Sequence, residues 1–127
     1  MTKTRIVLCG SMKVKEEIIK VKEELEKKDY DVLIPSECLE DIPKEIASRI
    51  HFDKIKDPKT EIVLIVNTTK NNIENYIGPN SFAEIAFAFY FNKETYLLND
   101  YYEPYLDELK AWKVKVLHNN LDNIKKK

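Results

Sequence analysis

Glu61-Ile-Val-Leu-Ile-Val66 is an unbroken apolar run behind one acidic residue. Such a run is typical of a strand in a parallel sheet, because helices cover both faces of that sheet. Four shorter apolar runs lie elsewhere in the chain, each bounded by glycine, proline or polar residues. They occupy residues 5–9, 31–34, 95–98 and 114–117. The sequence therefore predicts five strands.

Segments with helical periodicity separate these runs. In residues 12–28 the apolar side chains recur on one helical face, as Val14, Ile18, Val21 and Leu25. Further helices are expected at residues 43–56, 80–92 and 104–112. This alternation predicts an α/β fold, a five-stranded parallel sheet with right-handed crossovers and helices on both faces. We expect the flavodoxin-like strand order 2-1-3-4-5, in which a ligand binds at the carboxyl ends of the first and third strands.

The composition predicts one folded domain over residues 1–127. The formal net charge is −1, so neither a nucleic acid nor an anionic membrane is expected as a partner. The first apolar run is too short to span a membrane and lacks the layout of a signal peptide, so we expect a cytoplasmic protein. Cys9 and Cys38 form no metal-binding pair and His51 and His118 are far apart in sequence, so no metal site is expected.

The chain has only two glycines, and both lie where the expected topology places a ligand. Gly10 ends the first strand, and Gly78 lies between the third strand and its helix. Each could simply relieve a tight turn. Their joint position favours close approach of the backbone to a ligand. Ser11 and Lys13 follow Gly10 at the start of a helix, where phosphate groups bind readily.

Glu84 is the only acidic or basic side chain, tyrosine aside, between Glu74 and Lys93. Residues 85–91 are all apolar or aromatic, which predicts a helix buried on every side. A carboxylate in such a helix is costly to desolvate. Two explanations stay open at this point. Glu84 lies at the rim of a ligand pocket, or it forms an S-x-x-E capping box with Ser81 and has no chemical role.

Two further features have more than one interpretation. Asp53 lies on the second helix near the expected ligand edge, yet a solvated helix aspartate is the commoner case. Four aromatic residues after the fourth strand form either core packing or an interface, namely Tyr101, Tyr102, Tyr105 and Trp112.

Taken together, three motifs resemble the nucleoside 2-deoxyribosyltransferase superfamily, with the 2′-deoxynucleoside 5′-phosphate N-hydrolases as the most similar branch. The motifs are Leu8-Cys-Gly-Ser-Met-Lys13, Gly78-Pro-Asn-Ser-Phe-Ala-Glu84-Ile-Ala-Phe-Ala88 and Asn92-Lys93. The similarity spans residues 5–116.

The resemblance implies two catalytic residues. Glu84 is expected to be the nucleophile, and Asp53, eight residues before Glu61, is expected to contact the base and to hold or protonate it as it departs. Residues at the two glycine turns are expected to bind the sugar and phosphate, namely Gly10, Ser11, Lys13, Gly78, Asn80 and Ser81. The resemblance implies no cofactor and no metal. It also implies a homodimer or higher homo-oligomer, because in this family a neighbouring subunit completes each site.

The expected function is cleavage or transfer of the N-glycosidic bond of a (deoxy)nucleoside or its 5′-monophosphate through a glycosyl-enzyme intermediate. Phe82 and Ala83 stand where the family usually has smaller residues, and Gly78 stands where it often has Asp or Ser. The added bulk predicts a narrower pocket. One alternative, motivated by Phe82, is a nucleotide-binding or sensor module of the same fold without catalysis. Another is a glycosidase acting on a different N-glycoside such as NAD.

Overall fold

The computed structural model describes residues 3–124. Its five parallel strands form one sheet in the order β2-β1-β3-β4-β5, which confirms the predicted α/β flavodoxin-like topology. The strands are β1 (Arg5–Cys9), β2 (Asp31–Leu33), β3 (Thr60–Ile65), β4 (Glu94–Leu97) and β5 (Lys115–Val116). Cys9 and Ile65 are partners in the β1–β3 register, so the loops that follow these two strands leave the sheet together.

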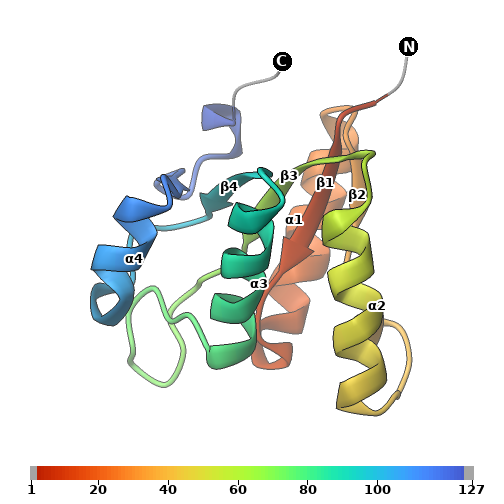
Figure 1. Cartoon of the computed structure of the whole chain (residues 1–127), viewed down its shortest axis with the longest axis horizontal. Helices are drawn as coiled ribbons and strands as arrows, with labels where there is room; N and C mark the ends of the chain where they lie inside the picture. The colour runs from red at the N-terminus through yellow and green to blue at the C-terminus, as the bar shows by residue number, and fades with distance from the viewer. Residues whose placement is uncertain (1–2, 125–127) are drawn as a thin grey trace.

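Four α-helices connect or follow the strands: α1 (Lys15–Lys27), α2 (Lys44–Lys56), α3 (Pro79–Tyr90) and α4 (Leu106–Ala111). Short 3-10 helices are η1 (Met12–Val14), η2 (Ser36–Cys38), η3 (Glu103–Tyr105) and η4 (Leu121–Asn123). The first and last predicted helices therefore begin with a 3-10 turn before becoming α-helical. Figure 1 shows α2 and α3 side by side on one face of the sheet, with α1 on the opposite face.

Alternate residues of β1 point into two different apolar layers. Ile6 and Leu8 pack in the layer that contains α1. Val7 and Cys9 pack in the layer formed with α2, α3 and α4. This is the period-two alternation of a strand, with both faces covered as expected for a parallel sheet. It places the Cys9 side chain on the same side of the sheet as α2 and α3.

The prediction that α3 is buried on every side is wrong. The sheet covers only one side of α3, where Ser81, Ile85 and Ala88 are buried. Phe89 and Tyr90 are exposed at the end of the helix. Phe82 and Phe87 are half-buried, so the side of α3 away from the sheet is only partly covered. No helix within the described residues is both long enough and apolar enough to cross a membrane.

Candidate functional site

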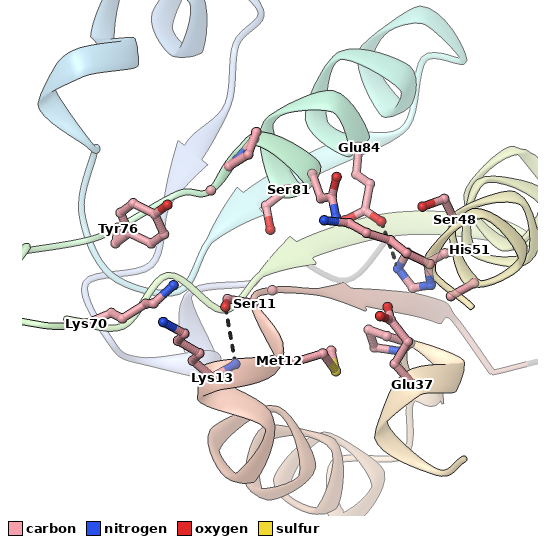
Figure 2. Close-up of a pocket in the computed structure, with 17 residues that line it drawn as sticks. Ser11, Met12, Lys13, Glu37, Ser48, His51, Lys70, Tyr76, Ser81 and Glu84 are labelled. Carbon is pink, nitrogen blue, oxygen red and sulfur yellow. Dashed lines mark hydrogen bonds and ion pairs between the residues drawn. The ribbon is translucent and has the colours of Figure 1, made fainter. Parts of the chain in front are cut away.

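A pocket of about 350 Å³ lies at the carboxyl ends of β1 and β3, where the topology predicts a ligand site. The turn after β1, the β3–α3 loop, the start of α3, the 3-10 helix η2 and one face of α2 enclose it. Its volume falls in the usual range for small-molecule sites. Figure 2 shows the side chains that point into it.

One end of the pocket carries positive charge. Lys13 and Lys70 lie there together with Ser11 (Figure 2). The Lys70 ammonium is 4.6 Å from the centre of the Tyr76 ring. Among residues 3–124, neither of these two lysines forms an ion pair with a carboxylate. Two cations without a protein counter-ion suit an anionic group such as a phosphate.

The start of α3 adds backbone donors to the pocket. Gly78 is the N-cap of this helix, and no side chain caps it. Pro79 occupies the first helical position, so Asn80 and Ser81 lie in the first turn and line the pocket. The free N–H groups of a helix N-terminus favour an anion.

The opposite end of the pocket is formed by η2 and α2. Glu37, Ser48 and His51 lie there (Figure 2). Lys44, the first residue of α2, also lines the pocket. Lys54 holds the two elements together, because its ammonium donates to the Ile34 carbonyl at 2.8 Å and to the Ser36 hydroxyl at 3.1 Å. This anchoring fixes Glu37 beside the cavity.

Glu84 lies between the two ends, on the wall formed by α3. Its side chain is 13% exposed and borders the pocket. The His51 Nε2 atom is 4.0 Å from Glu84 Oε2 and 3.3 Å from the Cys9 Sγ atom. Three elements that are distant in sequence, β1, α2 and α3, therefore bring a thiol, an imidazole and a carboxylate together.

Burial shifts the pKa of all three groups. Burial is the main cause that raises the pKa of Glu84 to about 7. The hydrogen bond with Cys9 lowers this pKa and the negative charge of Glu37 raises it. Burial is also the main cause that lowers the pKa of His51 to about 4. The positive charge of Lys54 lowers this pKa as well, whereas a hydrogen bond with the Leu8 backbone raises it. Burial raises the pKa of the Cys9 thiol. Since His51 is neutral wherever Glu84 is ionised, their 4.0 Å contact is not an ion pair.

The structure brings most of the residues predicted from sequence into this one pocket. The residues that line it are Gly10, Ser11, Lys13, Gly78, Asn80, Ser81 and Glu84. The capping-box explanation of Glu84 is wrong, because the helix begins at Pro79 and Ser81 lies inside it. Glu84 is thus in the second turn and faces a cavity.

Asp53 is not placed beside Glu84 within the chain. Its side chain is 74% exposed and is absent from the pocket wall, and its carboxylate lies 3.9 Å from the Lys56 ammonium. The α2 residues on that wall include Ser48 and His51. Two residues along an α-helix correspond to a rotation of about 200°, so Asp53 and His51 lie on opposite faces. The expectation that Asp53 and Glu84 share one cavity is therefore not met within a single chain.

Phe82 and Ala83 do not narrow the pocket. The Phe82 ring turns away from it and packs 4.3 Å from the centre of the Tyr105 ring and 5.5 Å from that of Trp112. The aromatic residues after β4 are thus at least partly core packing, and they accommodate Phe82. Ala83 is exposed on the outer side of α3. The sequence-based prediction of a narrower pocket is wrong.

Sequence reasoning missed several pocket residues, above all His51, Glu37 and Lys70. The separation of His51 from His118 in the sequence predicts no metal site, yet the structure places His51 against Cys9 and Glu84. The i, i+4 relation of Ala47, His51 and Ile55 marks the buried face of α2 and is the signal that identifies His51. Nothing in the sequence places Lys70, because the β3–α3 loop has no periodicity.

Comparison with known proteins adds one structural neighbour. No protein-family model matches the chain. No curated protein matches it either. The fold is similar to that of the Clostridium botulinum CMP N-glycosidase BcmB, with a TM-score of 0.59 and 16% sequence identity over 90% of this chain and 87% of the other. At this identity the similarity establishes a shared fold.

Proposed function

We propose that this protein cleaves the N-glycosidic bond of a nucleoside 5′-monophosphate, with Glu84 as the nucleophile. One observation supports this most strongly: the pocket places a nearly buried carboxylate between the cationic end with Lys13 and Lys70 and the opposite end formed by η2 and α2. A nucleotide has the same order of groups, with its anomeric carbon between phosphate and base. The neighbour that shares this fold is named as a CMP N-glycosidase, which is consistent with the proposal.

In the proposed complex, the phosphate lies at the cationic end against Lys13, Lys70 and the first turn of α3. The base lies at the other end, among Glu37, Ser48 and His51. Glu37 accepts hydrogen bonds only, so it favours a base that presents an amino group. This orientation brings the sugar beneath Glu84.

The chemistry then follows that of a retaining glycosidase. A Glu84 carboxylate oxygen bonds to C1′ while the C1′–N bond breaks. The electron pair of the C1′–N bond leaves with the base, and the base takes up a proton from solvent. A water molecule then attacks C1′ and displaces the Glu84 carboxylate. The water proton is released, and the products are free base and sugar phosphate. A second base in place of water would give transfer instead of hydrolysis.

The proposed assembly is a homodimer that uses the outer faces of α2 and α3. Ile46 and Ile50 are 50% and 37% exposed on α2, and Tyr90 is 78% exposed on α3. Helical spacing puts Asp53 on the same face of α2 as these isoleucines. A role for Asp53 near a base thus requires the pocket of a second subunit, since its own pocket does not contain it.

Base release from a panel of ribo- and deoxyribonucleosides and their 5′-monophosphates tests the proposal. We expect at least one monophosphate to release its base, and Glu84→Gln to lower that rate by at least about a thousandfold. Glu74→Gln, at an exposed position outside the pocket, is the matched control. Thermal stabilisation by a nucleotide without any base release would instead support the non-catalytic binding module.

A further inference from the structure

The thiol, imidazole and carboxylate beside the pocket have the composition of a metal-ion site. Cys9 Sγ, His51 Nε2 or Nδ1 and a Glu84 carboxylate oxygen all lie within 4.8 Å of one another. Cys9 and His51 are buried, and Glu84 is nearly so. The cluster is therefore a shielded set of three different donors, unlike a group of exposed acidic residues.

The spacing of these donors is close to that required by zinc. Bond lengths of about 2.0–2.3 Å in a tetrahedral zinc site separate neighbouring ligand atoms by about 3.3–3.8 Å. The Cys9–His51 distance is 3.3 Å and the His51–Glu84 distance is 4.0 Å. The third separation, between Cys9 Sγ and a Glu84 carboxylate oxygen, is at most 4.8 Å. Zinc binding therefore requires the side chains to rotate closer together.

The donor set selects one class of cation. Thiolate and imidazole favour Zn²⁺ and the softer Cd²⁺, whereas Mg²⁺ and Ca²⁺ take oxygen ligands. His51 and Glu84 line the pocket, so an ion reaches the cluster from the cavity. Three protein ligands leave a fourth tetrahedral position, which a water molecule would fill.

We propose that Cys9, His51 and Glu84 form a reversible Zn²⁺ site, and that bound zinc inhibits the enzyme. Binding displaces the thiol proton of Cys9 into solvent and uses the Glu84 carboxylate as a ligand. A coordinated carboxylate is not free to attack C1′. The inhibitory consequence rests on the proposed function, but the metal site itself does not.

Metal titration of EDTA-treated protein tests the site without any measurement of turnover. Cd²⁺ reports directly on Cys9, because a cadmium–thiolate bond gives a new ultraviolet absorption band. We expect one equivalent of Cd²⁺ to produce this band, and Zn²⁺ to bleach it by competition. Cys9→Ser removes the band, whereas Cys38→Ser, at the other buried free cysteine, retains it.

A second variant tests the site even if Cys9→Ser does not fold. His51→Gln keeps the thiol and is expected to weaken Cd²⁺ binding at least about tenfold, with an unchanged far-ultraviolet circular dichroism spectrum. The proposal is overturned by an absent band in the wild-type protein, by a band that persists in Cys9→Ser, or by unchanged affinity in His51→Gln.

Inhibition is then measured separately. If the protein releases base, Zn²⁺ is expected to lower the rate and EDTA to restore it, in the wild-type protein and in Cys38→Ser alike. Full activity at zinc concentrations that saturate the cadmium-binding site would disprove inhibition. If no nucleotide is cleaved at all, the proposed function fails while the metal titration still decides the site.

Discussion

Glu84 and His51 exchange a proton with solvent in different pH ranges, and this separation has consequences for activity. The pKa of Glu84 is raised to about 7 and that of His51 is lowered to about 4, in both cases mainly by burial. At pH 8 the site contains a carboxylate beside a neutral imidazole. Near pH 5.5 both groups are uncharged, so the nucleophile is absent.

The first prediction concerns the pH dependence of base release. Because the nucleophile must be ionised, kcat/KM should rise about tenfold per pH unit below 7 and level off above it. Glu37→Gln removes a negative charge that raises the pKa of Glu84, so the midpoint should move to lower pH. Glu23→Gln, on the exposed side of α1, should leave the midpoint unchanged. A profile that falls as pH rises through 7 would contradict a carboxylate nucleophile.

The second prediction concerns the two lysines at the cationic end. Lys13→Met or Lys70→Met should each raise KM for a nucleoside monophosphate about tenfold, because a charge-assisted contact to phosphate is lost. The same variants should leave KM for the corresponding nucleoside nearly unchanged. Lys20→Met, at an exposed position on α1, is the matched control. Equal losses on nucleotide and nucleoside would place the phosphate elsewhere.

At the scale of single elements, the turn after β1 is restricted by packing. Neither glycine has a positive φ angle, so conformational freedom explains neither of them. A Cβ atom on Gly10 would lie 3.1 Å from the Ile18 side chain and 3.3 Å from the Val66 carbonyl oxygen. The atoms nearest to a Cβ atom on Gly78 belong to the Tyr76 side chain, the closest at an ordinary contact distance of 3.4 Å. The two pocket glycines therefore differ in their structural role.

The third prediction uses this difference. Gly10→Ala should lower the free energy of unfolding by about 1–2 kcal/mol, because α1 and the β3 end must both shift to admit the methyl group. Gly78→Ala should change it by less than about 0.5 kcal/mol. Urea denaturation followed by circular dichroism measures both. Equal effects of the two substitutions would contradict the conclusion that packing restricts Gly10 more than Gly78.

Most strands and helices could be predicted from sequence, because burial of one or both faces of an element sets the spacing of its apolar residues. β3 was expected at residues 61–66 and occupies Thr60–Ile65, a shift of one residue. Glu84 could be identified because a lone carboxylate is conspicuous in an apolar helix. Asp53 was paired with it by counting along the chain, and counting does not determine the rotation of a helix. The rotation of α2 depends on which of its residues pack on the sheet, and it turns His51 instead of Asp53 toward the pocket.

The cluster of Cys9, His51 and Glu84 was also beyond sequence reasoning. Its members lie on three elements, and no local spacing connects them. Only the strand order and the rotations of α2 and α3 together bring them within contact. Loop residues such as Lys70 and Tyr76 were equally inaccessible, because their positions depend on a turn closed by the Lys70–Ile73 bridge.

At the scale of the whole molecule, aromatic and aliphatic side chains are exposed on the outer side of α2 and α3. Phe52, Phe87, Phe91 and Tyr90 form a continuous chain of ring contacts across the two helices, with centroids 4.7–5.4 Å apart. Phe91 and Tyr90 remain exposed at its end. A patch of this kind is typical of a protein–protein interface.

The fourth prediction is that a second copy covers this surface. Ile50→Glu and Tyr90→Glu should each shift the protein from dimer toward monomer, because a charge would be buried in the interface. Ile73 is 43% exposed in the β3–α3 loop, away from this surface, so Ile73→Glu should not change the proportion of dimer. Sedimentation equilibrium over a range of concentrations measures the dissociation constants. A wild-type protein that stays monomeric at high concentration would contradict the proposed assembly.

Covalent capture of the intermediate would identify the nucleophile, which we expect to be Glu84. A 2′-deoxy-2′-fluoro-arabinosyl nucleoside monophosphate slows both steps of a retaining mechanism, because fluorine destabilises the oxocarbenium-like transition state. Intact-protein mass spectrometry should show the added mass of one sugar phosphate, and peptide mapping should locate it on Glu84. The adduct should be absent from Glu84→Gln. Base release with the adduct on another residue, or undiminished release by Glu84→Gln, would contradict the account.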